Sequence, residues 1–85
     1  MRRWVSSISY RAAIGRIVAA RSAARLTQRE LAERLGKPPS FIAKIELGER
    51  RLDIVEFIAL ARALGLDPAE FVGSLNAELG PDLDI

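Results

Sequence analysis

The sequence predicts an all-α fold in which five short helices pack around one core. Apolar residues recur at intervals of three and four along most of the chain, which is the period of an amphipathic helix, and no stretch alternates as a strand would. Helix-start signals recur as well, in which Thr or Asp precedes Glu by three residues. With 85 residues, 49% of them hydrophobic, the chain suffices for one compact domain and not for two.

The first helix is expected at about residues 9–24, after a basic arm at residues 1–8. Its inward stripe follows steps of four, three, one and three, which keep side chains on one helix face. The stripe consists of Tyr10, Ile14, Ile17, Val18 and Arg21. Residues 1–29 contain no acidic residue, which is also typical of a mitochondrial transit peptide, although the same residues fit the folded domain.

Thr27 and Glu30 start the second helix. The Thr27 hydroxyl can accept a hydrogen bond from the third helical amide while the Glu30 carboxylate reaches back, which makes a capping box. Gly36 is expected to end this helix in the left-handed conformation. The inward residues are Leu31, Ala32 and Leu35. Ala32 is small, as a close crossing of the second and third helices requires.

Two adjacent prolines open the third helix, which is expected from about Pro39 to Leu47 and to stop at Gly48. Pro39 suits the first helical turn, because its φ is already near −65°. Pro38 has no side-chain oxygen for capping, so the next amides need another partner, either water or a phosphate. The inward residues are Ile42 and Ile45.

Two further caps start the fourth and fifth helices. Asp53 precedes Glu56, and Asp67 precedes Glu70 with a proline at the first helical position. The expected inward stripe of the fourth helix is Ile54, Phe57, Ile58, Ala61 and Leu64. The fifth helix is expected to close the core with Phe71, and an acidic tail follows at residues 80–85.

Charge is divided unevenly along the chain. Residues 1–51 hold twelve Lys or Arg and four acids, whereas residues 52–85 hold one Arg and seven acids. A basic half suits a polyanion such as nucleic acid, and an acidic half must face away from one.

The composition also excludes several classes of function. The chain has neither Cys nor His, which removes disulfides, thiolate nucleophiles, imidazole acid–base chemistry and most zinc sites. Its acidic pairs are spaced as helix caps and not as convergent carboxylates, so we expect no enzyme activity, cofactor or metal. No apolar run approaches the ~20 residues of a membrane span, and no signal-peptide core follows Arg2 and Arg3, so a cytoplasmic protein is expected.

Three segments carry a family pattern: LTQRELAERLG, SFIAKIELGERR and LARALGLDPAEF. They closely resemble the phage-repressor-like helix-turn-helix family (XRE, Cro/cI type), whose pattern reads L-T-Q-x-x-L-A-x-x-L-G, I-x-x-I-E-x-G and A-x-A-L-G. The resemblance covers residues 17–72 without a gap. It implies a five-helix, lambda-repressor-like domain over residues 9–79, with the second and third helices as the helix-turn-helix. It also implies a transcriptional regulator, such as a repressor, that binds operator double-stranded DNA as a homodimer.

The resemblance places the candidate DNA contacts on the helix-turn-helix and on the loop that follows it. They are Thr27, Gln28, Lys37, Pro39, Ser40, Phe41, Ala43, Lys44, Arg50 and Arg51. In the family, the residue that matches Gln28 touches the DNA backbone or braces the recognition helix. The family usually has a capping Ser or Thr where Pro38 stands and a polar, base-reading residue where Pro39 stands, so this chain has lost one hydrogen-bonding reader.

Chemistry leaves several of these roles open. Lys44 can donate to guanine O6 and N7, or it can bind a phosphate. Phe41 can contact a thymine methyl group or fill the core beside the turn. Arg50 and Arg51 can contact phosphates or remain solvated. The arm that carries Arg2 and Arg3 can enter a minor groove or lie frayed.

Two further expectations concern structure. The resemblance suggests that Arg21 and Glu46 form a partly buried pair that aims the recognition helix; the alternative is two solvated charges. An apolar stripe on the fifth helix extends beyond what a four-helix core can cover, which favours a dimer interface over a helix folded wholly into its own monomer. The stripe consists of Val72, Leu75 and Leu79. An antitoxin-type or adaptor protein that uses the fold for a protein partner is the alternative function.

Overall fold

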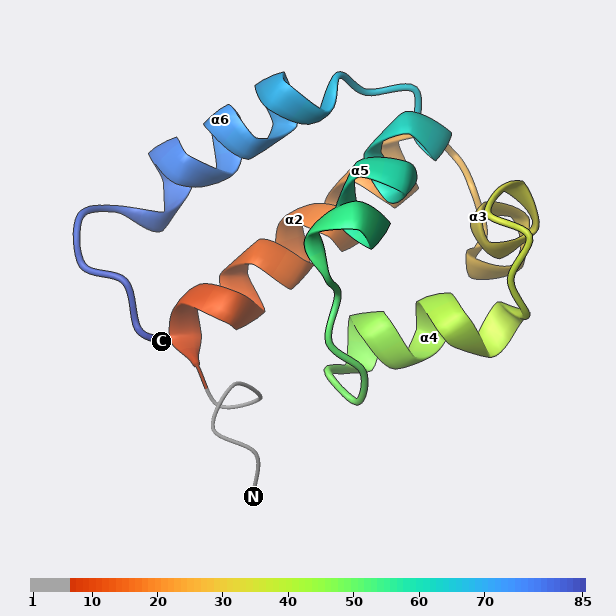
Figure 1. Ribbon diagram of the computed structural model, residues 1–85, viewed down its shortest axis with the longest axis horizontal. Coiled ribbons are helices and arrows are strands. Elements are labelled where there is room, and N and C mark those ends of the chain that lie inside the picture. The colour runs from red at the N-terminus through yellow and green to blue at the C-terminus, as the bar shows by residue number, and fades with distance from the viewer. Residues whose placement is uncertain (1–6) are drawn as a thin grey trace.

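Five helices surround a single core in the computed structural model, which describes residues 7–85 (Figure 1). They are α2 (Ile8–Ala23), α3 (Gln28–Arg34), α4 (Pro39–Leu47), α5 (Ile54–Ala63) and α6 (Pro68–Leu79). No strand occurs among these residues, so the predicted all-α class is confirmed. Each expected helix is present, and its ends lie close to the predicted positions.

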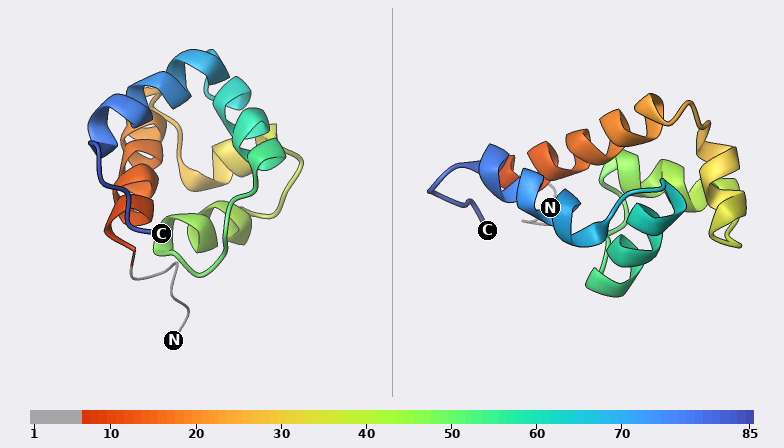
Figure 2. Two further views of the ribbon diagram at one scale, coloured as in Figure 1. Left: turned by 60° about the vertical axis from the view of Figure 1, so that its left-hand side comes forward. Right: turned by 90° about the horizontal axis from the view of Figure 1, so that it is seen from above.

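Helix α2 crosses the molecule and packs against both α4 and α6. Figure 1 shows α2 running diagonally between α6 and α4, and Figure 2 shows the same helices from two further directions. Helix α3 packs most closely on α4, and α5 packs on α6, where the rings of Phe57 and Phe71 stack with their centroids 5.4 Å apart. The helix pair α3–α4 is therefore supported by α2 and α5, and α6 packs on both of these helices.

The core is aliphatic except for one aromatic ring, and every helix contributes to it. It consists of Ile14, Ile17, Leu31, Ala32, Ile42, Ile45, Leu60, Ala61, Leu64 and Phe71. Burying one Leu or Ile side chain stabilises a fold by ~1.5–3 kcal/mol, so these contacts dominate stability. The inward positions expected on the first three helices are buried or partly buried as predicted.

Ile54 is the exception to the predicted stripe of the fourth helix. Its side chain is 76% exposed, whereas Leu60, which the stripe omitted, is buried. Ile54 is the first residue of α5 and lines an open apolar groove between α2, α5 and α6. The expectation that Ile54 points into the core is wrong, because this groove leaves its side chain exposed to solvent.

The predicted capping boxes are present at two helix starts. Thr27 Oγ1 accepts from the amide of Glu30 at 3.0 Å, while Glu30 Oε1 accepts from the amide of Thr27 at 2.9 Å. Asp53 and Glu56 make the same reciprocal pair at the start of α5. These bonds satisfy amides that a helix leaves without partners in its first turn, which is why the signals mark the helix starts.

The end of the chain returns to the beginning of α2. The backbone amide of Ile8 donates to Asp84 Oδ2 at 2.8 Å, and the amide of Asp84 donates to Ser9 Oγ at 2.9 Å. The buried hydroxyl of Ser7 donates to the Asp84 carbonyl oxygen and accepts from the amide of Tyr10. The acidic tail is thus bonded to the domain, and the helix starts within the residues assigned to the basic arm. The rest of that arm, residues 1–6 with Arg2 and Arg3, lies outside the described residues.

Candidate nucleic-acid interface

Helices α3 and α4 form the helix-turn-helix, joined by a turn of four residues. Gly36 adopts a φ of 67° in this turn, which a glycine tolerates best, and the amide of Lys37 bonds back to the carbonyl of Ala32 at 2.9 Å. The Ala32 side chain is completely buried where the two helices pack. A larger side chain at Ala32 would therefore push α4 away from its support.

The two prolines lie at the start of α4 as expected. Pro38 is the N-cap residue and supplies no side-chain hydrogen bond, and Pro39 occupies the first helical position. The amide of Phe41 donates to the Pro38 carbonyl at 2.9 Å, which satisfies one donor of the first turn within the backbone. Helix α4 ends at Gly48, whose φ is 79°.

The outer side of α4 is not covered by the described chain. Pro39, Ser40 and Lys44 are exposed, and Ala43 is half-buried, while the opposite side carries the buried Ile42 and Ile45. Ser40 and Lys44 are four residues apart and so lie on one face of the helix. The predicted base-contacting residues of α4, apart from Phe41, therefore share an open surface.

Arg21, Gln28 and Glu46 form one polar cluster that joins three helices. Arg21 Nε donates to Glu46 Oε2 at 2.6 Å, and Gln28 Nε2 donates to Glu46 Oε1 at 2.8 Å. The side chains of Arg21 and Glu46 are only 16% and 8% exposed. The hydrogen bond to Glu46 raises the pKa of Arg21. Of the two roles open for Gln28, its geometry matches the bracing role.

Phe41 and Arg50 are held away from the outer side of α4. The Phe41 ring is partly buried against the core, with Arg50 Cζ 4.6 Å and Lys37 Nζ 5.5 Å from its centroid. Arg50 also donates to both carboxylate oxygens of Glu56, at 2.9 and 2.7 Å. This geometry matches the alternative in which Phe41 fills the core beside the turn. The ion pair between Arg50 and Glu56 was not predicted from the sequence. The six-residue spacing across a loop gave no signal for it.

The other predicted contacts lie around the same surface. Thr27 and Lys37 are exposed at the two ends of α3 and its turn, and Arg51 is exposed in the α4–α5 loop. The Thr27 hydroxyl already serves the capping box. The structure thus brings the cationic groups of the turn and the loop to the two ends of α4.

Two of the three predicted dimer residues border an apolar groove between α2, α5 and α6. Val72 and Leu75 line this groove, which has a volume of about 300 Å³, together with Tyr10, Ile14 and Phe57. Val72 is 50% exposed, and Ile54 and Val55 stand exposed at the neighbouring start of α5. Leu79 is half-buried and does not line the groove. Ile54 thus belongs with the apolar surface residues that sequence reasoning assigned to α6 alone.

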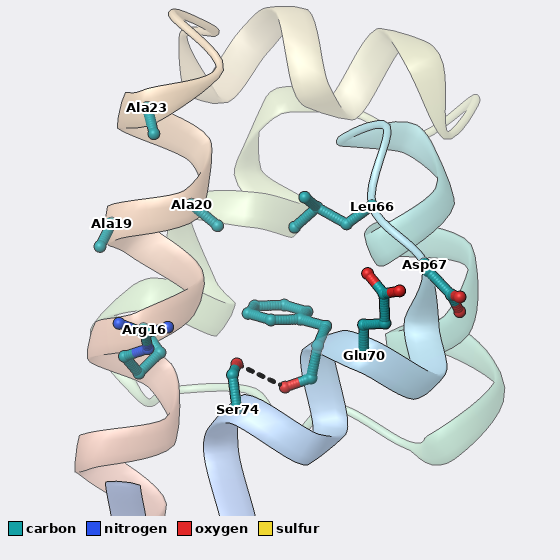
Figure 3. A pocket seen from close by; sticks show the side chains of 9 residues that line it. Arg16, Ala19, Ala20, Ala23, Leu66, Asp67, Glu70 and Ser74 are labelled. Carbon is teal, nitrogen blue, oxygen red and sulfur yellow. Dashed lines mark hydrogen bonds between the residues drawn. The ribbon is translucent and has the colours of Figure 1, made fainter. Parts of the chain in front are cut away.

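A second hollow lies between α2 and the first half of α6 (Figure 3). It measures about 410 Å³, and Figure 3 shows Ala19, Ala20 and Ala23 on one wall and Leu66 and Glu70 on the other. Small side chains on α2 leave this space open, while Ser74 Oγ bonds to the carbonyl of Phe71 within α6. The hollow lies away from α4 and plays no part in the candidate interface.

Comparisons with known proteins agree with this geometry. The HTH_3 helix-turn-helix family model matches residues 17–71. An XRE-family like protein from Pseudomonas syringae pv. tomato is 47% identical, with a TM-score of 0.79 over 82% of this chain and 85% of that one. The restriction-modification controller protein C.AhdI from Aeromonas hydrophila is 32% identical, with a TM-score of 0.64 over 71% of this chain and 87% of that one.

A third structure, the clp gene regulator ClgR from Corynebacterium glutamicum, shares the fold at 24% identity, with a TM-score of 0.68 over 81% of this chain and 74% of that one. Among curated proteins, none matches this chain. The chain belongs to the HTH_3 (XRE) helix-turn-helix family of DNA-binding regulators, which are not enzymes. The predicted family and lambda-repressor-like fold are confirmed.

Residues 7–85 have two further properties that bear on function. None of their helices is both long enough and apolar enough to cross a bilayer. The same residues contain no group of three or more acidic side chains placed to hold a metal ion.

Proposed function

We propose that this protein is a sequence-specific transcriptional regulator that occupies operator DNA in the cytoplasm as a homodimer, with α4 in the major groove. The observation that carries the proposal is the open outer side of α4, a short rigid helix whose inner side is buried and whose angle is held by Glu46. In helix-turn-helix proteins the second helix lies in the major groove with its N-terminal residues at the base edges.

Ser40 and Lys44 are the proposed polar readers. Both are exposed on one face of α4, and Lys44 can donate to guanine O6 and N7. Pro39 and Ala43 lie beside them and can contact thymine methyl groups. Lys37 and Arg51 flank the helix and are assigned to phosphates, which position the protein without reading sequence.

The proposed dimer uses the apolar surface of α6 with the start of α5. A twofold axis through this surface would place two copies of α4 about 34 Å apart, which matches successive major grooves on one side of a duplex. It would also keep the acidic residues of α6 away from the phosphates. Exposed apolar residues gathered around a groove are typical of such an interface.

One observation favours a second candidate, an antitoxin-type or adaptor protein that binds mainly another protein. Pro38 and Pro39 supply no hydrogen-bonding side chain at the start of α4, which is where the family places a polar reader. In that case the basic residues would give only weak, sequence-independent DNA binding.

Selection of bound fragments from a pool of random duplex DNA tests the proposal. We expect enrichment of a two-part site with twofold symmetry, because each subunit of a homodimer reads one half. Enrichment of no sequence, with binding that falls equally for all duplexes as salt rises, would contradict specific recognition and favour the adaptor.

A further inference from the structure

We propose that Arg50 is a positioning residue and not a phosphate ligand: with Glu56 and Phe41 it forms a bracket that ties the start of α5 to the first turn of α4. The inference rests on the proposed function in that the consequence of the bracket is measured as DNA affinity. It reassigns one residue that the family resemblance places on DNA.

The guanidinium of Arg50 is engaged on several sides. Its two terminal nitrogens donate to the two carboxylate oxygens of Glu56, at 2.9 and 2.7 Å, which is the bidentate geometry that favours Arg over Lys. One of these nitrogens also donates to the carbonyl of Arg51 at 2.8 Å. Its Cζ atom lies over the Phe41 ring, 4.6 Å from the ring centroid.

Both carboxylate oxygens of Glu56 also accept hydrogen bonds within the bracket. Its Oε1 accepts from the amide of Asp53 at 3.0 Å as part of the α5 capping box, while both of its oxygens accept from Arg50. The Arg50 guanidinium, and after it the Asp53 amide, hold the pKa of Glu56 below its ordinary value. The Glu56 side chain is 22% exposed, so the ion pair is partly shielded from water.

Phe41 connects this pair to the recognition helix. It occupies the third position of α4 and packs against the core from there. Lys37 Nζ lies 5.5 Å from the centroid of the same ring, so the ring also restrains the cation that precedes the two prolines. The chain of contacts therefore runs from the α5 cap through Arg50 and Phe41 to the end of α4 that enters the groove.

The bracket compensates for the missing side-chain cap at the start of α4. Pro38 provides no side-chain cap for α4, so at the N-cap the helix start is held by backbone only, through the bond from the Phe41 amide to the Pro38 carbonyl. The Glu46 cluster holds α4 near its other end, eight residues after Pro38. With both ends held, the angle of α4 to the body of the domain is fixed, which a reading helix needs for its contacts to align.

The substitution Glu56→Gln distinguishes the two possible roles of Arg50, because they predict opposite changes in DNA affinity. Gln keeps the capping box, because an amide oxygen can still accept from Asp53, but its NH₂ group cannot accept the second Arg50 bond. If Arg50 binds phosphate, losing its acidic competitor leaves DNA binding unchanged or tighter. If Arg50 belongs to the bracket, we expect binding about tenfold weaker, although the domain gains one positive charge.

Binding is measured by fluorescence anisotropy on a labelled random-sequence duplex and on a duplex selected by the wild-type chain. The measurements are made at a temperature where circular dichroism shows every variant folded. Glu33→Gln on the exposed side of α3 is the matched control, since it changes net charge equally and is expected to bind as well as the wild type. Wild-type or tighter binding by Glu56→Gln would overturn the bracket.

A second variant tests the same inference through the salt dependence. Arg50→Met keeps an apolar contact with the Phe41 ring but removes the ion pair. We expect weaker binding with an unchanged slope of log K against log salt, whereas loss of a phosphate contact lowers the slope by about one. A slope lowered in this way would overturn the inference.

Failure of the proposed function gives a different pattern. If the wild-type chain binds neither duplex, the regulator is rejected, and the bracket is then judged from urea unfolding alone. Arg50→Met and Glu56→Gln should be strongly non-additive in the double variant, because each removes the same contact. Additive effects would reject the bracket whatever the DNA result.

Discussion

Arg21 in α2 and Glu46 in α4 are joined by a two-point ion pair, with Arg21 Nε 2.6 Å from Oε2 and Nη2 3.1 Å from Oε1. Arg21 also donates to the carbonyl of Leu26, so its guanidinium has partners at all three nitrogens. The pair links the helix that crosses the molecule to the helix proposed to read DNA. Most of its surface is withdrawn from water, so losing one partner leaves a poorly solvated charge.

Arg21→Ala is expected to lower the free energy of unfolding by ~3–5 kcal/mol, because Glu46 is then left without its counter-charge. Gln28→Ala should cost less, about 1–2 kcal/mol, since Glu46 keeps its ion pair. Urea denaturation followed by circular dichroism measures both changes. Arg29→Ala, an exposed arginine on α3, is the control and should alter stability by no more than about 0.5 kcal/mol. A loss for Arg21→Ala as small as that of the control would show that the pair is energetically neutral.

Lys44 and Arg51 are expected to differ in what their removal does to DNA binding. Lys44→Ala should weaken the selected site by ~1–3 kcal/mol and relax preference at one base pair, as expected for a base contact. Arg51→Ala should weaken all duplexes alike and reduce the salt slope by about one. Titrations on selected and scrambled duplexes at several salt concentrations measure these effects. Equal loss on every sequence for Lys44→Ala would assign that lysine to phosphate.

Val72→Asp is expected to yield monomers. The change places a charge on a half-exposed residue beside the α2–α5–α6 groove, where a second copy would have to desolvate it. Sedimentation equilibrium measures the mass, and circular dichroism checks that the domain stays folded. Leu83→Asp, an exposed apolar residue of the tail, is the control and should leave the mass unchanged. An unaltered association constant for Val72→Asp would remove the α6 surface from the dimer.

Asp84→Ala is expected to lower the free energy of unfolding by about 1 kcal/mol, the usual effect of losing a side chain that caps a helix start. The lost bond is the one from the amide of Ile8 to Asp84 Oδ2. Hydrogen exchange should accelerate at that amide, and Asp82→Ala is the control because Asp82 lies in the same tail. Unchanged exchange at Ile8 would show that the tail bond is not maintained in solution.

Acid should weaken the domain partly through Glu56, whose pKa is lowered in the folded state first by Arg50 and then by the Asp53 amide. Because the unfolded chain binds the proton more tightly, this contribution is present above the unfolded value of about 4.3 and is lost as pH falls through the folded pKa. Urea unfolding between neutral and acidic pH should show a smaller acid-side loss for Glu56→Gln than for the wild type. Coincident profiles would contradict this origin of the acid sensitivity.

Short-range chemistry made most of the fold predictable. The capping boxes at Thr27 and Asp53 close within four residues, so the sequence itself contains both partners. Ile54 shows where periodicity stops being informative: it has the phase of the buried stripe but lines an open groove between α2, α5 and α6. Phase is a property of one helix, whereas burial depends on how closely the neighbouring helices pack against it.

The candidate site was also predictable in part from the sequence. The open side of α4 follows from the inward phase of Ile42 and Ile45, and the Arg21–Glu46 pair came from the family pattern. The pairing of Arg50 with Glu56 was not predictable, because an ion pair across an irregular loop produces no periodic pattern in the sequence. The contacts of Asp84 join residues more than seventy positions apart and likewise have no local signature.

The bonds between Asp84 and the residues that begin α2 make the path of the backbone nearly circular. A short peptide could join these two regions covalently with little movement of either helix, and the chain could then be opened at the exposed turn between α5 and α6. The order of helices along the polypeptide would change, while α3 and α4 remained consecutive and kept their supports. The architecture that presents α4 is therefore separable from the order in which its parts are connected.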